Sequence, residues 1–440
     1  MKVKIIDYTH EGLGVAKKDN NVIFIPNTIK DKEYEIKIID RKKNYLIGEN
    51  IDNLNTTKCQ YYLDCGSCDI RHLTYKQQCD FKVKALKETL KKQNINSNIN
   101  KIIKNEEINH YRNKVMLPFG IKNKKIICGY FKNKSKDIVE IKECLLQNDL
   151  INNIINDIIK LLNDTNQSVY DFKRKKGNLR HLYIRYGKNT DELMICFVCS
   201  RNKINNQKEI VKKLVSKYPN IKSIVINENK RNNSAVLGFK NYNLYNCNFI
   251  HEKIGNLLFR LEPNTFFQVN TLQMKKLYDE AKRMLDLNKN DLILDAYCGV
   301  GSIGLYFAKD VSYVYGVEIN EKSIKMAKIN QKNNNILNAD FFVGDANNVI
   351  NKLDLPVNKI ILDPPRSGLE KGTIDFLNKN EFEKVVYISC NPATLARDLN
   401  LLKTYDIIEI TPVDMFSQTH HLECVCLLIK KGENESSCRS

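Results

Sequence analysis

A cysteine near the carboxyl end of the chain has the surroundings of a nucleophile. Cys390 follows the apolar run Lys384–Ile388, which is expected to form a buried strand. Asn391 and Pro392 end that strand, so the thiol should face a cleft at its carboxyl end. A thiolate there can add to an electrophilic carbon and split one difficult step into two easier ones. Taken alone, Cys390 could equally be a small core residue.

A general base is available further along the chain. Glu423 directly precedes a second apolar strand, expected at Cys424–Ile429, and a carboxylate at a strand edge can accept a proton. His420 and His421 are rival bases, and Glu423 alone could be a surface charge. A thiol paired with a base suits methylation at C5 of uracil. Thiolate addition at C6 makes C5 nucleophilic, and the base then removes the C5 proton; a lowered pKa of the thiol would assist.

The preceding strand ends carry features of a cofactor site. Asp295-Ala-Tyr-Cys-Gly299-Val-Gly301-Ser-Ile-Gly304 places glycines between a buried strand and a helix, where the backbone can approach a ligand closely. Glu318 ends the next strand and can grip ribose hydroxyls, and Asp345 is placed to contact an adenine ring. NAD would also fit the glycines. Asp295 and Asp363, however, would repel a pyrophosphate and suit the cationic methionine end of S-adenosylmethionine (SAM).

Alternating helices and buried strands should position these groups. Strands are expected at 292–296, 314–319, 359–362 and 384–388, with helices at 275–285 and 323–332. This alternation predicts an α/β fold, a parallel sheet with helices on both faces that binds ligands at the carboxyl ends of its strands. We therefore expect a Rossmann-like, SAM-dependent methyltransferase domain over residues 266–440.

Two further domains are expected before it. Residues 1–56 show short alternating strands separated by turns, which predicts a small OB-like β-barrel that binds RNA. Residues 57–265 should form a mixed α+β central domain, with a helix over Thr74–Lys92. Basic clusters with aromatic neighbours occur there, at Phe172–Lys176 and Arg180–Tyr186. Such clusters can follow phosphates while their rings stack on bases, although a solvated basic face is an equal explanation.

The composition points to a polyanion partner. The 440 residues include 70 Lys and Arg against 51 Asp and Glu, a net charge of +19. No run approaches the ~18–20 apolar residues of a membrane span, and the N-terminus lacks a signal peptide. The chain is therefore expected to be cytoplasmic, with no membrane partner. In that compartment its 14 cysteines do not form a disulfide framework.

Some of those cysteines have the spacing of metal ligands. Cys59, Cys65 and Cys68 are close together, and Cys144 stands much further on. Four thiolates can hold Zn²⁺ or an iron–sulfur cluster, and the spacing does not choose between them. Cys79 is a rival for the fourth position.

Five motifs in combination resemble the RNA uracil-C5 methyltransferase family. They are Thr265-Phe-Phe-Gln-Val-Asn270, Asp295-Ala-Tyr-Cys-Gly299, Asp363-Pro-Pro-Arg366, Ser389-Cys-Asn-Pro392 and His421-Leu-Glu423. The resemblance implies that Cys390 is the nucleophile and Glu423 the base. It also implies SAM contacts from four residues: Gln268, Tyr297, Glu318 and Asp363.

The resemblance extends over the whole chain. The N-terminal barrel resembles the TRAM domain of the branch that methylates 23S ribosomal RNA. In that branch a cysteine set like this one resembles a 4Fe–4S site, which implies four ligands: Cys59, Cys65, Cys68 and Cys144. We therefore expect a 23S ribosomal RNA methyltransferase that acts as a monomer, since one chain holds all the proposed parts.

Three other functions stay open at this point. A transfer RNA uridine-C5 methyltransferase is the main alternative. A cytosine-C5 methyltransferase fits less well, because Glu423 and the Ser389–Pro392 context match the uracil enzymes. A non-catalytic RNA-binding assembly factor is opposed by the intact set of Cys390, Glu423 and Asp363. No motif specifies which uridine is modified, or whether one or two are.

Overall fold

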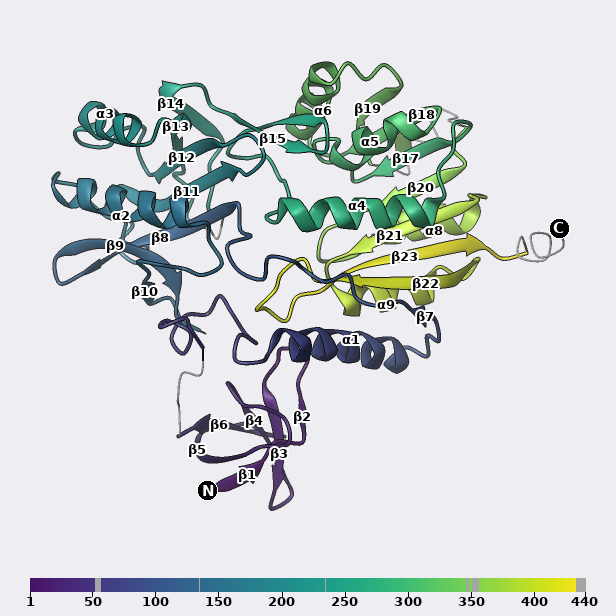
Figure 1. Cartoon of the computed structure of the whole chain (residues 1–440), viewed down its shortest axis with the longest axis horizontal. Helices are drawn as coiled ribbons and strands as arrows, with labels where there is room; N and C mark the ends of the chain where they lie inside the picture. The colour runs from purple at the N-terminus through teal and green to yellow at the C-terminus, as the bar shows by residue number, and fades with distance from the viewer. Residues whose placement is uncertain (52–56, 134, 234, 346–347, 350–355, 433–440) are drawn as a thin grey trace.

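The structure is a computed structural model that describes residues 1–51, 57–133, 135–233, 235–345, 348–349 and 356–432. Figure 1 shows a small N-terminal sheet at the bottom, a central sheet on the left and a C-terminal sheet on the right. Helix α1 (Tyr75–Lys92) lies between the N-terminal sheet and the C-terminal one.

The N-terminal sheet has six strands in the order β1-β5-β6-β4-β3-β2. They are β1 (Lys2–Lys4), β2 (Asp7–Tyr8), β3 (Gly14–Lys18), β4 (Asn21–Ile25), β5 (Glu33–Arg41) and β6 (Leu46–Asn50). Alternate residues point inward along these strands, and Ile23, Ile25 and Ile36 belong to one small core. The sheet is a half-barrel, which confirms the predicted N-terminal β-domain.

The central sheet has seven strands in the order β10-β9-β8-β11-β12-β13-β14. They are β8 (Lys114–Lys122), β9 (Lys125–Phe131), β10 (Ile138–Glu140), β11 (Leu179–Gly187), β12 (Glu192–Cys199), β13 (Ile221–Glu228) and β14 (Lys240–Asn246). Helices α2 (Asp149–Asn163) and α3 (Gln207–Lys217) pack their apolar sides against it. The result is a mixed α+β layer, as predicted.

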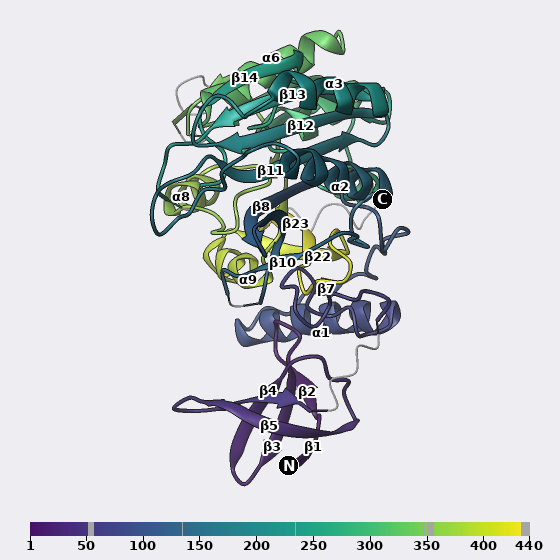
Figure 2. The ribbon, with the colours of Figure 1, turned by 90° about the vertical axis from the view of Figure 1, so that its left-hand side faces the viewer.

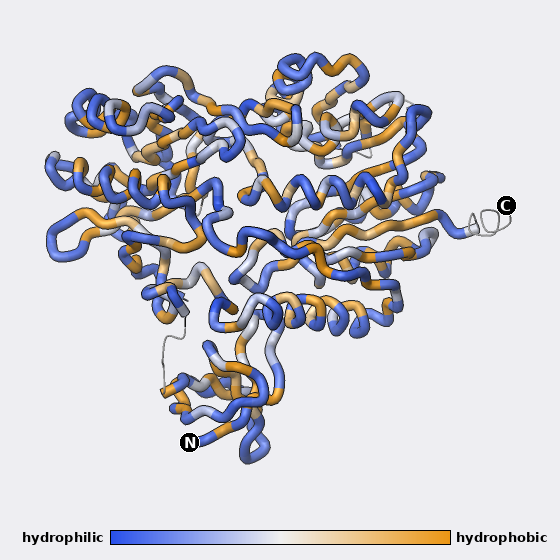
Figure 3. The backbone as a smooth tube through the Cα atoms, viewed as in Figure 1, coloured by the Kyte–Doolittle hydropathy of each residue, from blue (hydrophilic) through white to orange (hydrophobic). Residues whose placement is uncertain are grey.

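The C-terminal sheet has eight strands in the order β19-β18-β17-β20-β21-β23-β22-β7. They are β7 (Asn98–Ile99), β17 (Leu292–Ala296), β18 (Tyr313–Glu318), β19 (Ala339–Val343), β20 (Lys359–Leu362), β21 (Lys384–Ser389), β22 (Tyr405–Val413) and β23 (Glu423–Lys430). The five strands from β19 to β21 are parallel, and β23 runs antiparallel to both of its neighbours. Figure 3 shows apolar residues along these strands, as expected of a sheet buried on both faces.

Helices cover both faces of this sheet. One face packs against α4 (Thr271–Leu285), α5 (Ser302–Phe307) and α6 (Glu321–Asn333), and the other against α1, α8 (Lys371–Lys379) and α9 (Pro392–Leu401). A short 3₁₀ turn, η1 (Ala308–Asp310), follows α5. This arrangement confirms the Rossmann-like methyltransferase fold. Helix α4 begins four residues before the predicted start at residue 275, because the side chain of Asn270 caps it by accepting the N–H of Gln273 at 3.2 Å.

Several segments cross the boundary expected at residue 265. Strand β7 joins the C-terminal sheet beside β22, and Leu86 and Leu90 of α1 lie in the same core as α8 and α9. The hairpin β15 (Ile250–Ile254) and β16 (Leu257–Leu261) likewise packs into the core beneath α4 and α6. The central and C-terminal parts are therefore interlocked.

One of the two predicted phosphate-binding clusters is buried. The side chains of Arg180 and Arg185 are 1% and 2% exposed. Arg185 donates to the carbonyl of Thr265 at 2.7 Å, and its guanidinium lies 5.7 Å from the ring of Tyr183. The interpretation of Arg180–Tyr186 as a phosphate-binding face is therefore wrong, because both guanidinium groups are buried and contact groups inside the protein. Residues 172–176 are exposed, as that interpretation requires.

No helix in the described part of the chain is long and apolar enough to cross a membrane.

Candidate active site

The predicted cofactor residues gather at the carboxyl edge of the C-terminal sheet. Glu318 ends β18, and Asp345 and Asp363 follow β19 and β20. Strands β18, β17 and β20 are adjacent and parallel, so their carboxyl ends meet at one edge. Tyr297 follows β17 and bonds through its hydroxyl to Thr373 at 2.9 Å. The structure thus brings together four of the five residues expected to contact SAM.

The glycine loop bends sharply between β17 and α5. Gly299 and Gly301 have φ angles of +54° and +77°, in the left-handed region that favours glycine. A Cβ on Gly304 would lie 2.8 Å from Val314 and 3.0 Å from a carboxylate oxygen of Asp295. Glycine is therefore required at these positions both for the turn and for close helix–strand packing.

Asp295 lies beneath this loop and is fully buried. Its Oδ2 accepts the N–H of Gly304 at 2.8 Å, while its Oδ1 has no hydrogen-bond partner among the described residues. Burial, with help from the neighbouring Asp363 and Glu318, raises the pKa of Asp295 to about 8. The carboxylate therefore braces the loop and leaves one acceptor for a ligand.

The same edge favours a cationic ligand. Burial raises the pKa of Asp363 to about 7. Tyr278 of α4, whose hydroxyl bonds to Ser302 at 2.9 Å, lies within the field of Asp363, Asp295 and Glu423, and its pKa is raised mainly by burial. Crowded, dehydrated carboxylates are relieved by a positive charge, such as the sulfonium and ammonium groups of SAM. The donor set therefore fits the predicted cofactor.

Cys390 directly follows β21, and Glu423 is the first residue of the neighbouring strand β23. Ser389 of β21 pairs with Cys424 of β23, so Cys390 and Glu423 occupy the next step of this antiparallel ladder. Ile388 and Val425 belong to the core on the α4 side of the sheet. The residues next to them, Tyr387, Cys424 and Cys426, pack on the opposite face. Since side chains alternate along a strand, Glu423 shares the face of Val425, and the thiol of Cys390 continues toward that face.

Burial and neighbouring charges raise the pKa of both groups. Burial first and Asp363 second raise the pKa of Glu423 to about 8, with Arg366 opposing. Burial first and Glu423 second raise the pKa of Cys390 to about 11, again with Arg366 opposing. The thiol pKa is therefore raised, whereas a lowered pKa would assist the reaction. Arg366, to which the sequence assigned no role, is the nearby cation that favours a thiolate.

The two histidines are less suited to act as the base. Nδ1 of His420 is 2.8 Å from Oδ2 of Asp69, so that ring is already engaged. Burial, followed by the field of His420, lowers the pKa of His421 to about 4, which makes it a weak base. Glu423 acts directly on the Cys390 thiol, and its pKa of about 8 suits a group that accepts and releases a proton.

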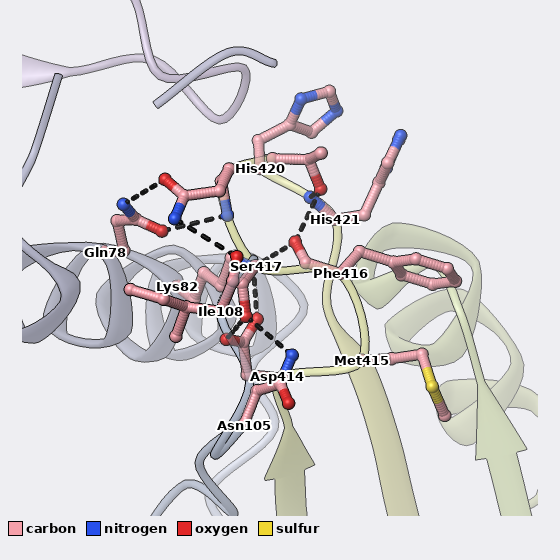
Figure 4. Close-up of polar contacts among 12 residues, drawn as sticks. Gln78, Lys82, Asn105, Ile108, Asp414, Met415, Phe416, Ser417, His420 and His421 are labelled. Atoms are coloured by element: carbon pink, nitrogen blue, oxygen red, sulfur yellow. Dashed lines mark hydrogen bonds and ion pairs between the residues drawn. The ribbon is translucent and has the colours of Figure 1, made fainter. Parts of the chain in front are cut away.

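A polar network holds the loop 414–422, which leads into Glu423 (Figure 4). Nζ of Lys82 on α1 is 2.6 Å from Oδ1 of Asp414, and both side chains are at most 1% exposed. The same ammonium donates to the carbonyl of Phe416 at 3.0 Å, and Ser417 donates to Oδ2 of Asp414 at 2.6 Å. Gln78 and Gln418 exchange two further hydrogen bonds. None of these distant contacts was visible in the sequence.

Gln268, the fifth residue expected to contact SAM, lies in the segment that leads into α4. It is 8% exposed, and its carbonyl accepts the Nδ2 of Asn113 at 3.1 Å. Asn270 donates to the carbonyl of Met415 at 3.2 Å and so connects this segment to the loop 414–422. Neighbouring Phe266 is 65% exposed, and Nζ of Lys114 lies 5.7 Å from its ring. Burial first, then Arg185, lowers the pKa of Lys114 to about 7. The sequence did not predict this shift.

Four of the predicted metal ligands line one small cavity. They are Cys59, Cys65, Cys68 and Cys144. Cys144 is held there by Asn152 of α2, which accepts its N–H at 3.0 Å. Cys79 lies elsewhere, near Asp414, so the structure favours Cys144 over its rival. Within the described residues, however, no three His, Cys, Asp or Glu side chains are arranged to hold a metal ion.

One arginine lines this cavity and a second lies near its cysteines. Arg71 lines the cavity and favours the thiolate of Cys68, whereas Arg112 favours that of Cys144. Nε of each arginine is buried without a hydrogen-bond partner in the described part of the chain. Burial raises the pKa of Cys68 to about 12, with Arg71 opposing. A thiolate-bound anionic group would satisfy both cations and stabilise the deprotonated sulfurs.

Comparison with known proteins agrees with this geometry. The chain matches the tRNA (uracil-5-)-methyltransferase family over residues 74–431 and the TRAM domain over residues 1–51. An uncharacterized RNA methyltransferase of Oceanobacillus iheyensis is 36% identical over 97% of this chain and 96% of its own length. One from Staphylococcus epidermidis is 37% identical over 98% and 97%.

A solved structure is similar over nearly the whole chain. It is the Pyrococcus abyssi tRNA (uracil-54, C5)-methyltransferase in complex with S-adenosyl-L-homocysteine, with a TM-score of 0.79 and 28% identity. The match covers 98% of this chain and 100% of that one. The chain therefore belongs to the tRNA (uracil-5-)-methyltransferase family and is a SAM-dependent RNA (uracil-C5)-methyltransferase with an N-terminal TRAM domain.

Proposed function

We propose that this enzyme methylates C5 of a uridine in 23S ribosomal RNA, with Cys390 as nucleophile and Glu423 as base. The observation that carries the chemistry is the placement of the Cys390 thiol, just after β21, opposite the carboxyl group of Glu423 at the start of β23, beside the acidic edge of the sheet. The ribosomal target rests on the resemblance of the barrel and the cysteine set to that branch of the family. An enzyme that acts on this RNA would work in the cytoplasm. It would act as a monomer, because one chain holds all the proposed catalytic parts.

The thiol and the carboxyl group divide the reaction between them. The thiolate of Cys390 adds to C6 of uracil, and the electron pair of the C5–C6 double bond moves toward the C4 carbonyl, which makes C5 nucleophilic. SAM, when bound, supplies the electrophilic methyl group that C5 takes up. Glu423 then removes the proton from C5, the double bond re-forms, and the thiolate of Cys390 leaves C6.

The carboxylates of the sheet edge prepare this chemistry. Glu318, Asp345 and Asp363 would hold the ribose, adenine and methionine parts of SAM, together with Gln268 and Tyr297. A cation bound among them would lower the pKa of Glu423, since Asp363 contributes to raising it. The resulting carboxylate is the form that accepts a proton. Arg366 favours the thiolate of Cys390.

We also propose that the four cavity cysteines, Cys59, Cys65, Cys68 and Cys144, hold a 4Fe–4S cluster. A single Zn²⁺ would draw four sulfurs to ~2.3 Å from one point, whereas a cluster spreads its ligands over four irons. The shared cavity and the arginine Nε atoms that lack a hydrogen-bond partner in the described residues support the larger, anionic group. The reaction needs no electron, so its role would be structural.

A transfer RNA uridine is the second candidate substrate. The Pyrococcus abyssi enzyme, which is named for a tRNA target, aligns with 98% of this chain. An N-terminal barrel therefore does not exclude a transfer RNA substrate.

Methylation assays with both RNAs would test the proposal. Wild type, Cys390→Ala and the matched control Cys426→Ala, whose thiol lies in the core on the opposite face, would receive labelled SAM and unmodified ribosomal or transfer RNA. We expect 5-methyluridine in ribosomal RNA from the wild type and the control only. Label confined to transfer RNA would select the second substrate, and methylation by Cys390→Ala would refute the mechanism.

A further inference from the structure

Two loops of the central domain meet at one edge of its sheet. Residues 170–178 lead into β11, and residues 229–239 connect β13 to β14. Strand β11 is antiparallel to β12, and β12 is parallel to β13, so the start of β11 and the end of β13 lie at the same edge. The two loops are therefore neighbours although they are far apart in the sequence.

The buried side chain of Arg180 contacts both loops. It is 1% exposed, and its Nη1 donates to the carbonyl of Asn229 at 2.7 Å. Its guanidinium lies 4.5 Å from the ring of Tyr170 and 5.0 Å from the ring of Phe172. Tyr170 in turn donates to Oδ1 of Asn232 at 2.9 Å. A buried cation that contacts both loops gives them one fixed arrangement.

Phe239 stands out from the second loop. Its side chain is 71% exposed, yet the guanidinium of Arg231 lies 4.5 Å from its ring and the ammonium of Lys322 lies 5.6 Å away. In the same loop the buried side chain of Asn229 donates to the carbonyls of Ala235 and Val236 at 2.7 and 2.8 Å, which fixes these three residues relative to one another. An exposed ring that is held in place and flanked by cations offers a face to an aromatic, anionic ligand.

Phe172 provides a second ring on the first loop. It is 50% exposed and contacts Tyr170 edge-to-face at 5.1 Å. The four residues after it, 173–176, are Lys, Arg, Lys and Lys, and all are exposed. Asp171 shapes this turn by accepting the N–H groups of Lys173 and Arg174 at 2.8 and 3.0 Å. The ring therefore lies beside a cluster of solvated positive charges.

This surface adjoins the segment that carries Phe266 and Gln268, and it lies far from the N-terminal sheet (Figure 1). Asn264, two residues before Phe266, donates to the carbonyl of Gly238 at 2.9 Å. Lys322 belongs to the first turn of α6 in the methyltransferase domain. Figures 1 and 2 both place β13, β14 and α6 at the end of the molecule opposite the N-terminal sheet. A long RNA that contacts both the N-terminal sheet and this surface would pass the part of the C-terminal sheet where Cys390 and Glu423 lie.

We propose that this surface binds an unpaired segment of the substrate RNA, with bases stacked on Phe172 and Phe239 and phosphates beside the surrounding lysines and arginines. The inference deepens the proposed function and rests on it, because it assigns a docking place to the RNA substrate. Stacking requires unpaired bases, whose faces a duplex hides. The surface therefore selects single-stranded RNA near the target uridine.

Binding measurements on the full-length protein would test this surface. The variants are Phe172→Leu, Phe239→Leu and their combination, which keep apolar bulk but remove the ring. Phe239→Tyr retains a ring, and Leu337→Ala, at a residue that is 90% exposed elsewhere, is the control for loss of exposed apolar area. The probe is a labelled, unpaired oligouridylate, and binding is measured over a series of salt concentrations.

We expect each Leu variant to lose roughly 5- to 150-fold in affinity for the probe, as base–aromatic stacking implies. The salt dependence of binding should not change, because no charge is removed. Phe239→Tyr and Leu337→Ala should bind as the wild type does. Leu variants with unchanged affinity, or a duplex RNA that competes as well as the unpaired probe, would overturn the inference. If the wild type binds in this way but makes no 5-methyluridine, the proposed function fails and this surface stands.

Discussion

Replacing Asp295 by Asn should stabilise the protein at alkaline pH and weaken its binding of SAM. The carboxyl group is fully buried, one of its oxygens has no partner among the described residues, and burial raises its pKa from 3.8 to about 8. The folded state therefore holds a proton that the unfolded state has released. Stability from this group is fully present below the unfolded pKa and is lost as pH rises toward the folded one.

The magnitude follows from the shift. About four pKa units, at about 1.36 kcal/mol each, make roughly 5 kcal/mol of destabilisation above the folded pKa. An Asn side chain does not titrate and still accepts the N–H of Gly304, but its amide leaves a buried donor unpaired at a cost of about 1–3 kcal/mol. The variant should therefore gain roughly 2–4 kcal/mol over the wild type at about pH 8.5 and lose its advantage at about pH 5.

Urea unfolding of both proteins at the two pH values would measure this difference. SAM affinity should fall by about tenfold or more, since the Asn side chain cannot lose a proton to become a carboxylate when a cationic ligand binds nearby. A variant that gains no stability relative to the wild type as pH rises would refute the assignment of a strained carboxylate. Unchanged SAM binding would show that Asp295 serves only the glycine loop.

Three other predictions concern the base, the buried ion pair and the cysteines. Glu423→Gln should accumulate a covalent protein–RNA complex that survives denaturing electrophoresis, because the C5 proton stays in place and the thiol cannot leave; rapid turnover without such a complex would contradict its role. Lys82→Met should cost roughly 3–5 kcal/mol of stability and most of the methylation rate, because it leaves the carboxylate of Asp414 buried without its cation at the start of the loop 414–422. Adding Asp414→Asn should recover part of that stability, and equal loss in the single and double variants would show that the charge pair is not the cause. Cys144→Ser should lose iron and sulfide in elemental analysis of anaerobically purified protein, whereas Cys79→Ser should keep both; zinc in the wild type would exclude the cluster.

The local sequence was enough to predict the layers of the methyltransferase domain. Strands β17 and β20 were expected with the bounds that the structure shows, because short, uninterrupted apolar runs between glycine or proline signals are typical of buried parallel strands. Cys390 and Asp363 could be placed at the carboxyl edge of the sheet for the same reason, since each comes just after such a run. The start of α4 was missed, because its cap, Asn270, looked like part of a binding motif.

The tertiary structure decided the roles of residues whose environment is built by distant segments. Arg180 and Arg185 looked like phosphate ligands, but their burial depends on packing against loops that only the folded sheet brings near. Asp69 and Lys82 contact the catalytic loop across more than 300 positions of sequence. The pKa values of Asp295, Cys390 and Glu423 likewise depend on dehydration and on neighbouring charges, which composition and spacing do not contain. A sequence encodes the period of its own elements, whereas burial and long-range contacts are properties of how those elements pack.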